Sequence, residues 1–290
     1  MGILFITIIP FSHSQVPIKN KQVITIQSLP VNASAKLLSE SKEILLRRLS
    51  YMNLRDVLVT QNNKKSELVI TVGDTIARET LSELLMIRGH LGFFETMNRQ
   101  EILKCFGKES TSCIQDAFTS LHLRDTVHLG PEVVLGIADG RDTISINSCL
   151  TSAAVKKLLP KKASLRWSIY PAVDNLFNLY CISSTAKSFT EQDILEAHAD
   201  FEKPELPTLC LTFKEKVWKS WKDATIRNMN KPIALVIDDK VYSAPRILGE
   251  IPHGKISLTG GGFSKAEVRK LVAIISNGAL PLKFNIVNHN

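Results

Sequence analysis

The chain has 290 residues, of which 44% are hydrophobic and 22% charged, an ordinary globular composition that excludes a disordered or fibrous protein. The net charge of +8 would suit an anionic partner, but the densest basic clusters are only the pairs Lys64-Lys65 and Lys161-Lys162, without neighbouring aromatic residues. Nucleic-acid channels concentrate charge and add stacking rings, so no nucleic-acid partner is expected.

The N-terminus carries an apolar run, Ile3 to Phe11, followed by Ser12-His13-Ser14-Gln15. As a helix this run reaches roughly 14 Å, about half of a hydrocarbon core. It is typical of a signal-peptide core, and the small Ser12 and Ser14 suit cleavage before Gln15, although no Lys or Arg precedes it. We therefore predict a signal peptide over residues 1–15 and an extracytoplasmic location, periplasmic or on the outer side of the inner membrane. No later apolar stretch approaches the roughly 18 residues of a spanning helix.

Residues 21–96 predict one compact α+β unit. The patterns predict strands at 23–26, 57–60, 68–72 and 91–94, and helices over 34–52 and from Asp74 or Thr75 to Gly89. The resulting order, β-α-β-β-α-β, is that of the ferredoxin-like split βαβ sandwich.

Residues 97–205 are less regular. The patterns predict helices near 99–106 and 111–121, a strand at 143–146, a short helix that begins at Thr151 and ends at Pro160, two strands within 165–185, and a helix that begins at 190–193.

The last third is the best patterned. It predicts strands at 208–213, 233–237, 241–243, 255–258 and 282–287, and helices at 214–228 and 264–277. Ser264 and Glu267 form a capping box for the second helix. The preceding Gly260-Gly261-Gly262 lacks the rest of a phosphate-binding pattern, so it indicates a tight turn.

Four ordered motifs in this third resemble the SecD protein-export family. They are the stretch 231–247 with its Val-Tyr-Ser243-Ala244-Pro245, the loop 256–263 with Thr259-Gly260 and Phe263, the turn Gly278-Ala279-Leu280-Pro281, and the upstream segment with Leu209 to Phe213, Trp221, Thr225 and Asn228. Residues 44–54, 67–73 and 89–95 are more weakly similar to the family's N-terminal helix and the strands that follow it.

This resemblance implies the organisation of the large extracytoplasmic domain of SecD. A ferredoxin-like base would comprise residues 21–96 and 279–290, and an inserted α+β head would comprise residues 97–278. SecD continues into a membrane bundle that, with SecF, couples proton flow to translocation. The membrane acids for that step have no counterpart in this sequence, so this chain alone is not expected to drive proton-coupled transport.

Residues for catalysis or cofactor binding are not evident. The five cysteines include no close pair of the zinc-site type, and the seven histidines are scattered. Cys105 and Cys113 flank a polar turn and could form a disulfide, whereas Asp238-Asp239 reads as a hairpin turn. We therefore predict no catalytic, cofactor or metal site.

Trp218 and Trp221 lie three residues apart on one predicted helix. Such spacing is usual for core residues, but the flanking lysines would also let the pair contact an unfolded peptide. The resemblance to SecD implies, as the first hypothesis, an exported, non-catalytic SecD-like module that binds unfolded or nascent exported polypeptides or Sec translocase subunits, by sheet-edge addition. The alternatives are an envelope structural domain without a translocation role and an extracytoplasmic hydrolase.

Overall fold

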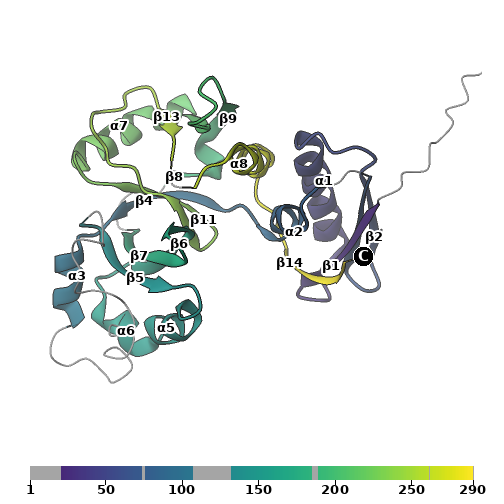
Figure 1. The fold of residues 1–290 in the computed structure, drawn as a ribbon, viewed down its shortest axis with the longest axis horizontal. Helices are drawn as coiled ribbons and strands as arrows, with labels where there is room; N and C mark the ends of the chain where they lie inside the picture. Colours follow the sequence, from purple (N-terminus) through teal and green to yellow (C-terminus); the bar gives the residue numbers. More distant parts are fainter. Residues whose placement is uncertain (1–20, 74–75, 107–131, 185–188, 261, 290) are drawn as a thin grey trace, which may run out of the picture.

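The computed structural model describes residues 21–73, 76–106, 132–184, 189–260 and 262–289. The predicted signal peptide and the helix predicted at 111–121 lie outside these residues. Figure 1 shows two parts, a smaller N-terminal unit on the right and a larger central unit on the left, with helix α8 between them. The fold mixes helices and strands throughout, as predicted.

The N-terminal unit is one antiparallel sheet with two helices. Its elements are β1 (Gln22–Leu29), α1 (Ala35–Tyr51), β2 (Leu58–Asn62), β3 (Glu67–Val72), α2 (Arg78–Met86) and β14 (Lys283–His289). The sheet order is β14-β1-β3-β2, and every neighbouring pair is antiparallel. Helix α1 begins where its sequence predicted, because the Ser34 hydroxyl accepts a hydrogen bond from the Leu37 backbone N–H at 3.3 Å.

The predicted strand at 91–94 is real but belongs to another sheet. As β4 (Leu91–Thr96) it pairs with β11 (Ile233–Ile237) of the central unit, from Ile233↔Glu95 to Ile237↔Leu91. The fourth strand of the N-terminal sheet is instead β14, from the end of the chain. The prediction that 91–94 completes the N-terminal sheet is therefore wrong, because local pattern defines a strand but not its partner.

The central unit contains a seven-stranded sheet in the order β5-β7-β6-β12-β11-β4-β8. Its further elements are α3 (Arg99–Phe106), β5 (Val134–Asp139), α5 (Thr143–Leu150), α6 (Ala153–Leu158), β6 (Ala163–Val173), β7 (Leu176–Ser183), β8 (Phe189–Thr190) and β12 (Lys240–Ser243). Strand β4 also pairs with β7 through Glu95↔Ser183 and Thr96↔Ile182. Strands β7, β6, β12, β11 and β4 thereby close into a ring.

A second sheet of three strands, in the order β13-β10-β9, completes the central unit. It comprises β9 (Ile194–Asp200), β10 (Thr208–Phe213) and β13 (Lys255–Leu258), accompanied by the 3-10 turns η1 (Glu191–Asp193) and η2 (Glu215–Val217) and by helices α7 (Trp218–Arg227) and α8 (Lys265–Asn277). The core between this sheet, α7, α8 and β4 is rich in aromatic rings. Phe93, Phe189, Phe213 and Trp221 have centroids 4.8–5.5 Å apart.

Two central predictions are wrong. Residues 143–146 form the start of helix α5, because Ile146, Cys149 and Leu150 are buried at helical spacing while Ile144 is 81% exposed. The helix predicted from 190–193 is a single 3-10 turn. The Thr190 and Asp193 cap does form, but the chain then extends as β9 to pair with β10.

Helix α8 is buried on two sides. Val268, Leu271, Val272 and Ile275 pack into the aromatic core of the central unit, whereas Ala273 and Ile274 pack into the core of the N-terminal unit. The helix therefore contributes to both hydrophobic cores at once.

Candidate functional site

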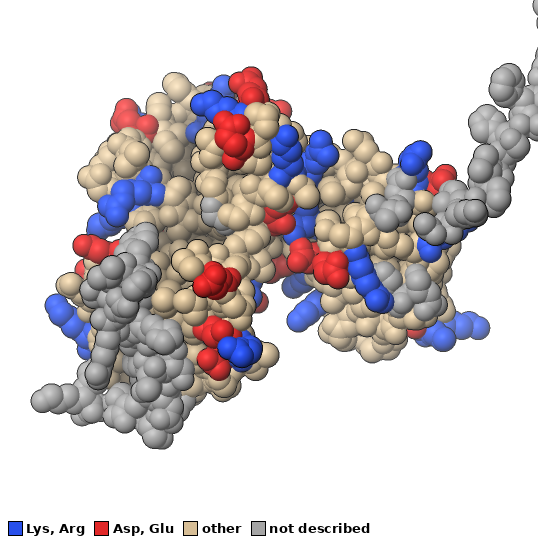
Figure 2. All heavy atoms as spheres, viewed as in Figure 1, with Lys and Arg blue, Asp and Glu red and all other residues tan. Residues whose placement is uncertain are grey.

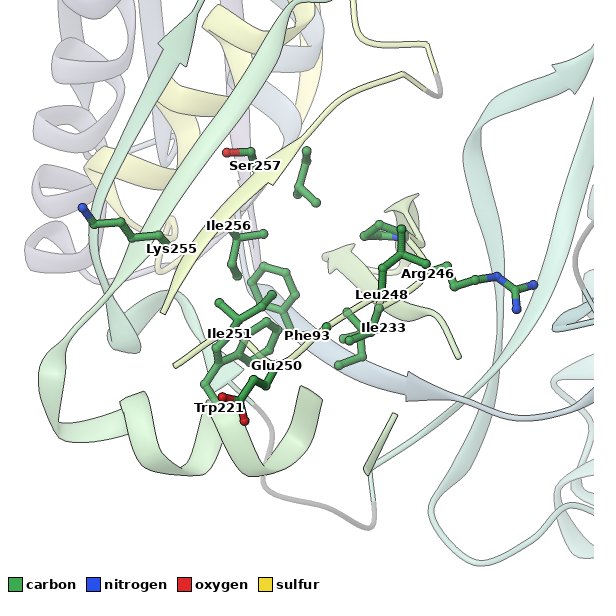
Figure 3. A pocket seen from close by; sticks show the side chains of 14 residues that line it. Phe93, Trp221, Ile233, Arg246, Leu248, Glu250, Ile251, Lys255, Ile256 and Ser257 are labelled. Carbon is green, nitrogen blue, oxygen red and sulfur yellow. The ribbon is translucent and has the colours of Figure 1, made fainter. Parts of the chain in front are cut away.

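A pocket of about 300 Å³ opens between strand β13 and the segment 245–251. Figure 3 shows Phe93 from β4, Trp221 from α7 and Ile233 from β11 among the side chains that line it, with Leu248, Ile251 and Ile256 around them. The volume is about twice that of a cavity that holds a benzene molecule, so the pocket can accept one or two large apolar side chains.

One wall of the pocket is a free sheet edge. Strand β13 pairs on one side with β10, from Leu209↔Leu258 to Thr212↔Lys255, and stands at the end of its sheet. In the part of the chain that the structure describes, no strand pairs with its other side, and no backbone hydrogen bond joins it to the segment 245–251. An edge of this kind can accept an added strand.

The rim of the pocket carries exposed apolar side chains as well as charged ones. Leu248 is 80% exposed, and Met229, itself exposed, forms a bridge to its neighbour Ile247. A single exposed leucine is common on any protein, but apolar side chains grouped beside a pocket indicate a contact surface.

The predicted Trp218–Trp221 pair does not form a surface. Trp221 is 1% exposed, with its ring against Phe93 and Phe213, so it contributes only to the pocket's inner lining. Trp218 is partly buried, and its Nε1 donates a hydrogen bond to the Phe213 carbonyl at 2.9 Å. Trp221 is therefore not an exposed half of a tryptophan pair, because its helix turns that ring into the core, and a peptide could contact it only from inside the pocket.

The SecD-like motif stretches contribute much of the pocket wall, through Trp221, Ile233, Pro245, Arg246, Ile247, Ile256, Ser257 and Leu258. Other motif residues hold the fold. Phe263 packs edge-on against Tyr170 at 6.1 Å, and Leu280 is fully buried in the core of the N-terminal unit. Three short groups of motif residues lie at the ends of elements. Ser243 and Ala244 lie at the end of β12, and Thr259 and Gly260 follow β13. The connection from α8 to β14 contains Gly278, Ala279 and Pro281.

A buried polar junction joins the two units. Arg48 of α1 is fully buried and donates hydrogen bonds to the carbonyls of Ile87 (2.6 Å), Arg88 (2.7 Å) and Gly278 (2.7 Å). Burial lowers the pKa of Arg48 to about 10, and the negative charge of Asp238 opposes that shift. Asp238, between β11 and β12, accepts from the backbone N–H groups of residues 88–90 at 2.9–3.1 Å. The Asp238-Asp239 turn predicted from sequence thus also fixes the N-terminal unit to the central one.

The capping box predicted for α8 forms only in half. The Ser264 hydroxyl accepts from the Glu267 backbone N–H at 3.1 Å, but the Ser264 N–H donates to the Gly262 carbonyl. The Glu267 carboxylate instead pairs with Lys270 at 2.7 Å and accepts from the Tyr170 hydroxyl. Lys270 also pairs with Glu83 of α2, so this cluster again links the two units.

Among the described residues, cysteines and potential metal ligands form no recognisable metal centre. Cys105 is a free thiol, so the disulfide that it could form with Cys113 is not present, and Cys113 itself lies outside the described residues. Within the described ranges, no group of three or more His, Cys, Asp or Glu side chains could hold a metal ion. On the face that Figure 2 shows, acidic and basic side chains are interspersed over both units.

Sequence reasoning does not identify the pocket as a site, although several lining residues lie in the SecD-like stretches. Phe93 pairs in the central sheet and not in the N-terminal one. The available signal is the group of apolar residues Ile247, Leu248 and Ile251 in a segment that also carries Gly249 and Pro252.

Comparisons with known proteins confirm the resemblance to the SecD family. Residues 175–282 match the model of the SecDF P1 head subdomain. Over 163 residues, 55% of this chain, the sequence is 31% identical to the protein translocase subunit SecD of Rhodothermus marinus, of which it covers 26%. Over 100 residues, 34% of this chain, it is 32% identical to SecD of Acidaminococcus fermentans, of which it covers 24%. The chain therefore spans about a quarter of the length of these relatives.

Among solved structures, the crystal structure of SecDF in its super-membrane-facing form is similar in fold. The similarity covers 94% of this chain and 30% of that chain, with a TM-score of 0.53 at 18% identity. No helix among the described residues is both long and apolar enough to cross a bilayer.

Proposed function

Because the chain carries a SecD-type head region over residues 175–282, we propose that it is an extracytoplasmic, non-catalytic module of protein export that binds extended segments of translocating polypeptides. The observation that carries this proposal is the juxtaposition of the apolar pocket with the free edge of β13. Backbone hydrogen bonds to the edge would supply affinity without regard to sequence, and the pocket would take alternate side chains.

We assign the N-terminal unit to a ferredoxin-like base and the central unit to an inserted head. The order β14-β1-β3-β2 with two helices supports the base, since this is the arrangement of a split βαβ sandwich. In this assignment the head begins at β4 rather than after residue 96, and the chain returns to the base at β14.

Peptide binding is the one activity that we propose for this pocket. The pocket's titratable side chains are Arg246, Glu250 and Lys255, and Glu250 is paired with Lys222 at 3.2 Å. Hydrolysis through a covalent intermediate would need a nucleophile beside a base, whereas Ser257, the hydroxyl among the lining residues, has the Cys210 thiol as its side-chain partner at 3.8 Å. The partner we propose is an unfolded or nascent exported chain presented by the Sec translocase.

The test is binding of a fluorescent extended peptide with leucine at alternate positions to the full-length chain, measured by anisotropy. Leu248→Asp should weaken binding about tenfold or more, because burial of a leucine is worth about 1.5–3 kcal/mol. The matched control is Leu195→Asp on β9, at the far edge of the same sheet and also well exposed. It should bind like the parent chain.

Strand addition is tested separately with the same peptide N-methylated at every second residue. Methylation on the hydrogen-bonding side should abolish binding, because it removes the donors that would pair with β13, whereas the register shifted by one residue should bind. Equal binding of both methylated peptides would contradict strand addition. Failure of every peptide to bind would favour the alternative of an envelope structural domain.

A further inference from the structure

Among the described residues around the proposed peptide pocket, the acidic side chains form ion pairs, whereas two basic side chains do not. Glu250 is held by Lys222, and the nearby Glu95 is held by Arg227 at 3.3 Å. Arg246 donates to the Asn230 carbonyl at 2.7 Å, but no carboxylate of the described residues pairs with it. Lys255 likewise has no carboxylate partner in the described part of the chain. Both cations are exposed, so the pocket keeps positive charge while its acids are paired.

The two cations stand on opposite sides of the pocket. Arg246 lies on the segment that follows β12, and Lys255 is the first residue of β13. Figure 3 shows their side chains pointing away from the pocket to either side, with Ile256, Ile251, Phe93 and Leu248 between them. An apolar centre between two unpaired cations is a pattern that a ligand can match by charge as well as by shape.

We propose that the pocket selects extended segments in which large apolar residues at alternate positions are flanked by acidic residues, and this rests on the proposed peptide-binding function. The four residues of β13 span about 13 Å, so the apolar part of the ligand is short and its flanks fall beside the two cations. A segment flanked by lysine or arginine would instead meet like charge at both ends, which disfavours it.

The experiment compares three peptides that share one alternating-leucine centre and carry aspartate, serine or lysine on both flanks. Binding to the full-length chain is measured by anisotropy at about 50 mM and about 500 mM salt. At low salt we expect the acidic peptide to bind about threefold to tenfold more tightly than the serine peptide, and the lysine peptide more weakly. At high salt the three affinities should converge, since exposed charges are screened.

The variant Arg246→Glu combined with Lys255→Glu should reverse this order. The control is Lys283→Glu on β14, which reverses the charge of an exposed side chain in the other unit and should leave the order unchanged. Both variants alter exposed side chains, so loss of folding is not expected, and circular dichroism checks it.

The outcomes separate the two proposals. Equal affinity of all three peptides, or the same order in the reversed variant, would overturn the charge selection and leave peptide binding standing. Absence of binding by any peptide would overturn peptide binding and the selection with it. Tightest binding of the lysine peptide would also refute the selection, because the paired acids would then be the groups that act.

Discussion

Replacing Arg48 by methionine should be one of the costliest single changes in the protein. The substitution removes a buried guanidinium that donates to the carbonyls of Ile87, Arg88 and Gly278 at 2.6–2.7 Å. The Arg88 carbonyl keeps the Leu280 backbone N–H as a donor. It also removes a positive charge that interacts with Asp238, which keeps its own contacts to residues 88–90. The methionine chain refills much of the volume, so the loss is electrostatic rather than a cavity.

The expected change in the free energy of unfolding follows from the balance between the lost hydrogen bonds and the relieved burial of charge. Each charge-assisted hydrogen bond contributes about 1.5–3 kcal/mol, but the lowered pKa of Arg48 shows that burial of its charge already offsets part of this. Removing one member of a buried charged network typically costs about 3–5 kcal/mol, which is our estimate here. A loss of this size lowers the urea midpoint by about 1–2 M.

The assay is urea denaturation followed by circular dichroism, with Arg47→Met as the matched control. Arg47 is the neighbouring arginine on the same helix but is exposed, so its replacement should change the free energy of unfolding by about 0.5 kcal/mol or less. Arg48→Lys should fall between the two, because three donors on one nitrogen cannot reach all the carbonyls. If Arg48→Met unfolds at the same urea concentration as Arg47→Met, the reasoning fails.

Two further predictions concern ionisation. Burial raises the pKa values of Tyr170, Tyr180 and Tyr242, so their folded-state pKa values lie above the unfolded value of about 10. Above that value the unfolded chain binds fewer protons than the folded one, so the free energy of unfolding should fall as pH rises above about 10. Tyrosinate absorbance at 295 nm should then appear together with loss of circular dichroism. Gradual ionisation of the tyrosines in a folded protein would contradict this. Burial raises the pKa of the Cys181 thiol to about 12, so iodoacetamide at pH 8 should label the partly exposed Cys105 first and Cys181 only after denaturation, and equal rates would refute the buried placement.

The elements that sequence predicted well are those whose local pattern and tertiary role agree. Helix α3 occupies residues 99–106 as expected, and α1 follows its Ser34 cap. Where the two disagree, the prediction failed. Thr143-Ile144-Ser145-Ile146 alternates like a strand, but the burial of Ile146 and Leu150 requires a helix, and only the longer window contains that information.

The candidate site was less accessible to sequence reasoning than the fold. It is built from β4, α7, β11, β13 and a segment without regular structure, so no single stretch of sequence carries it. The motifs shared with SecD instead marked positions such as Phe263 and Leu280, whose side chains are buried in the two cores. The same stretches also supply lining residues such as Trp221, Ile233 and Ile256, but nothing in their sequence indicates that these side chains enclose a pocket.

Because α8 places Val268, Leu271 and Val272 in one core and Ala273 and Ile274 in the other, neither unit is complete without it. A fragment cut at either end of this helix would expose apolar surface that the intact chain hides. We therefore expect the two units to unfold together, because the stability of each depends on side chains of this one shared helix.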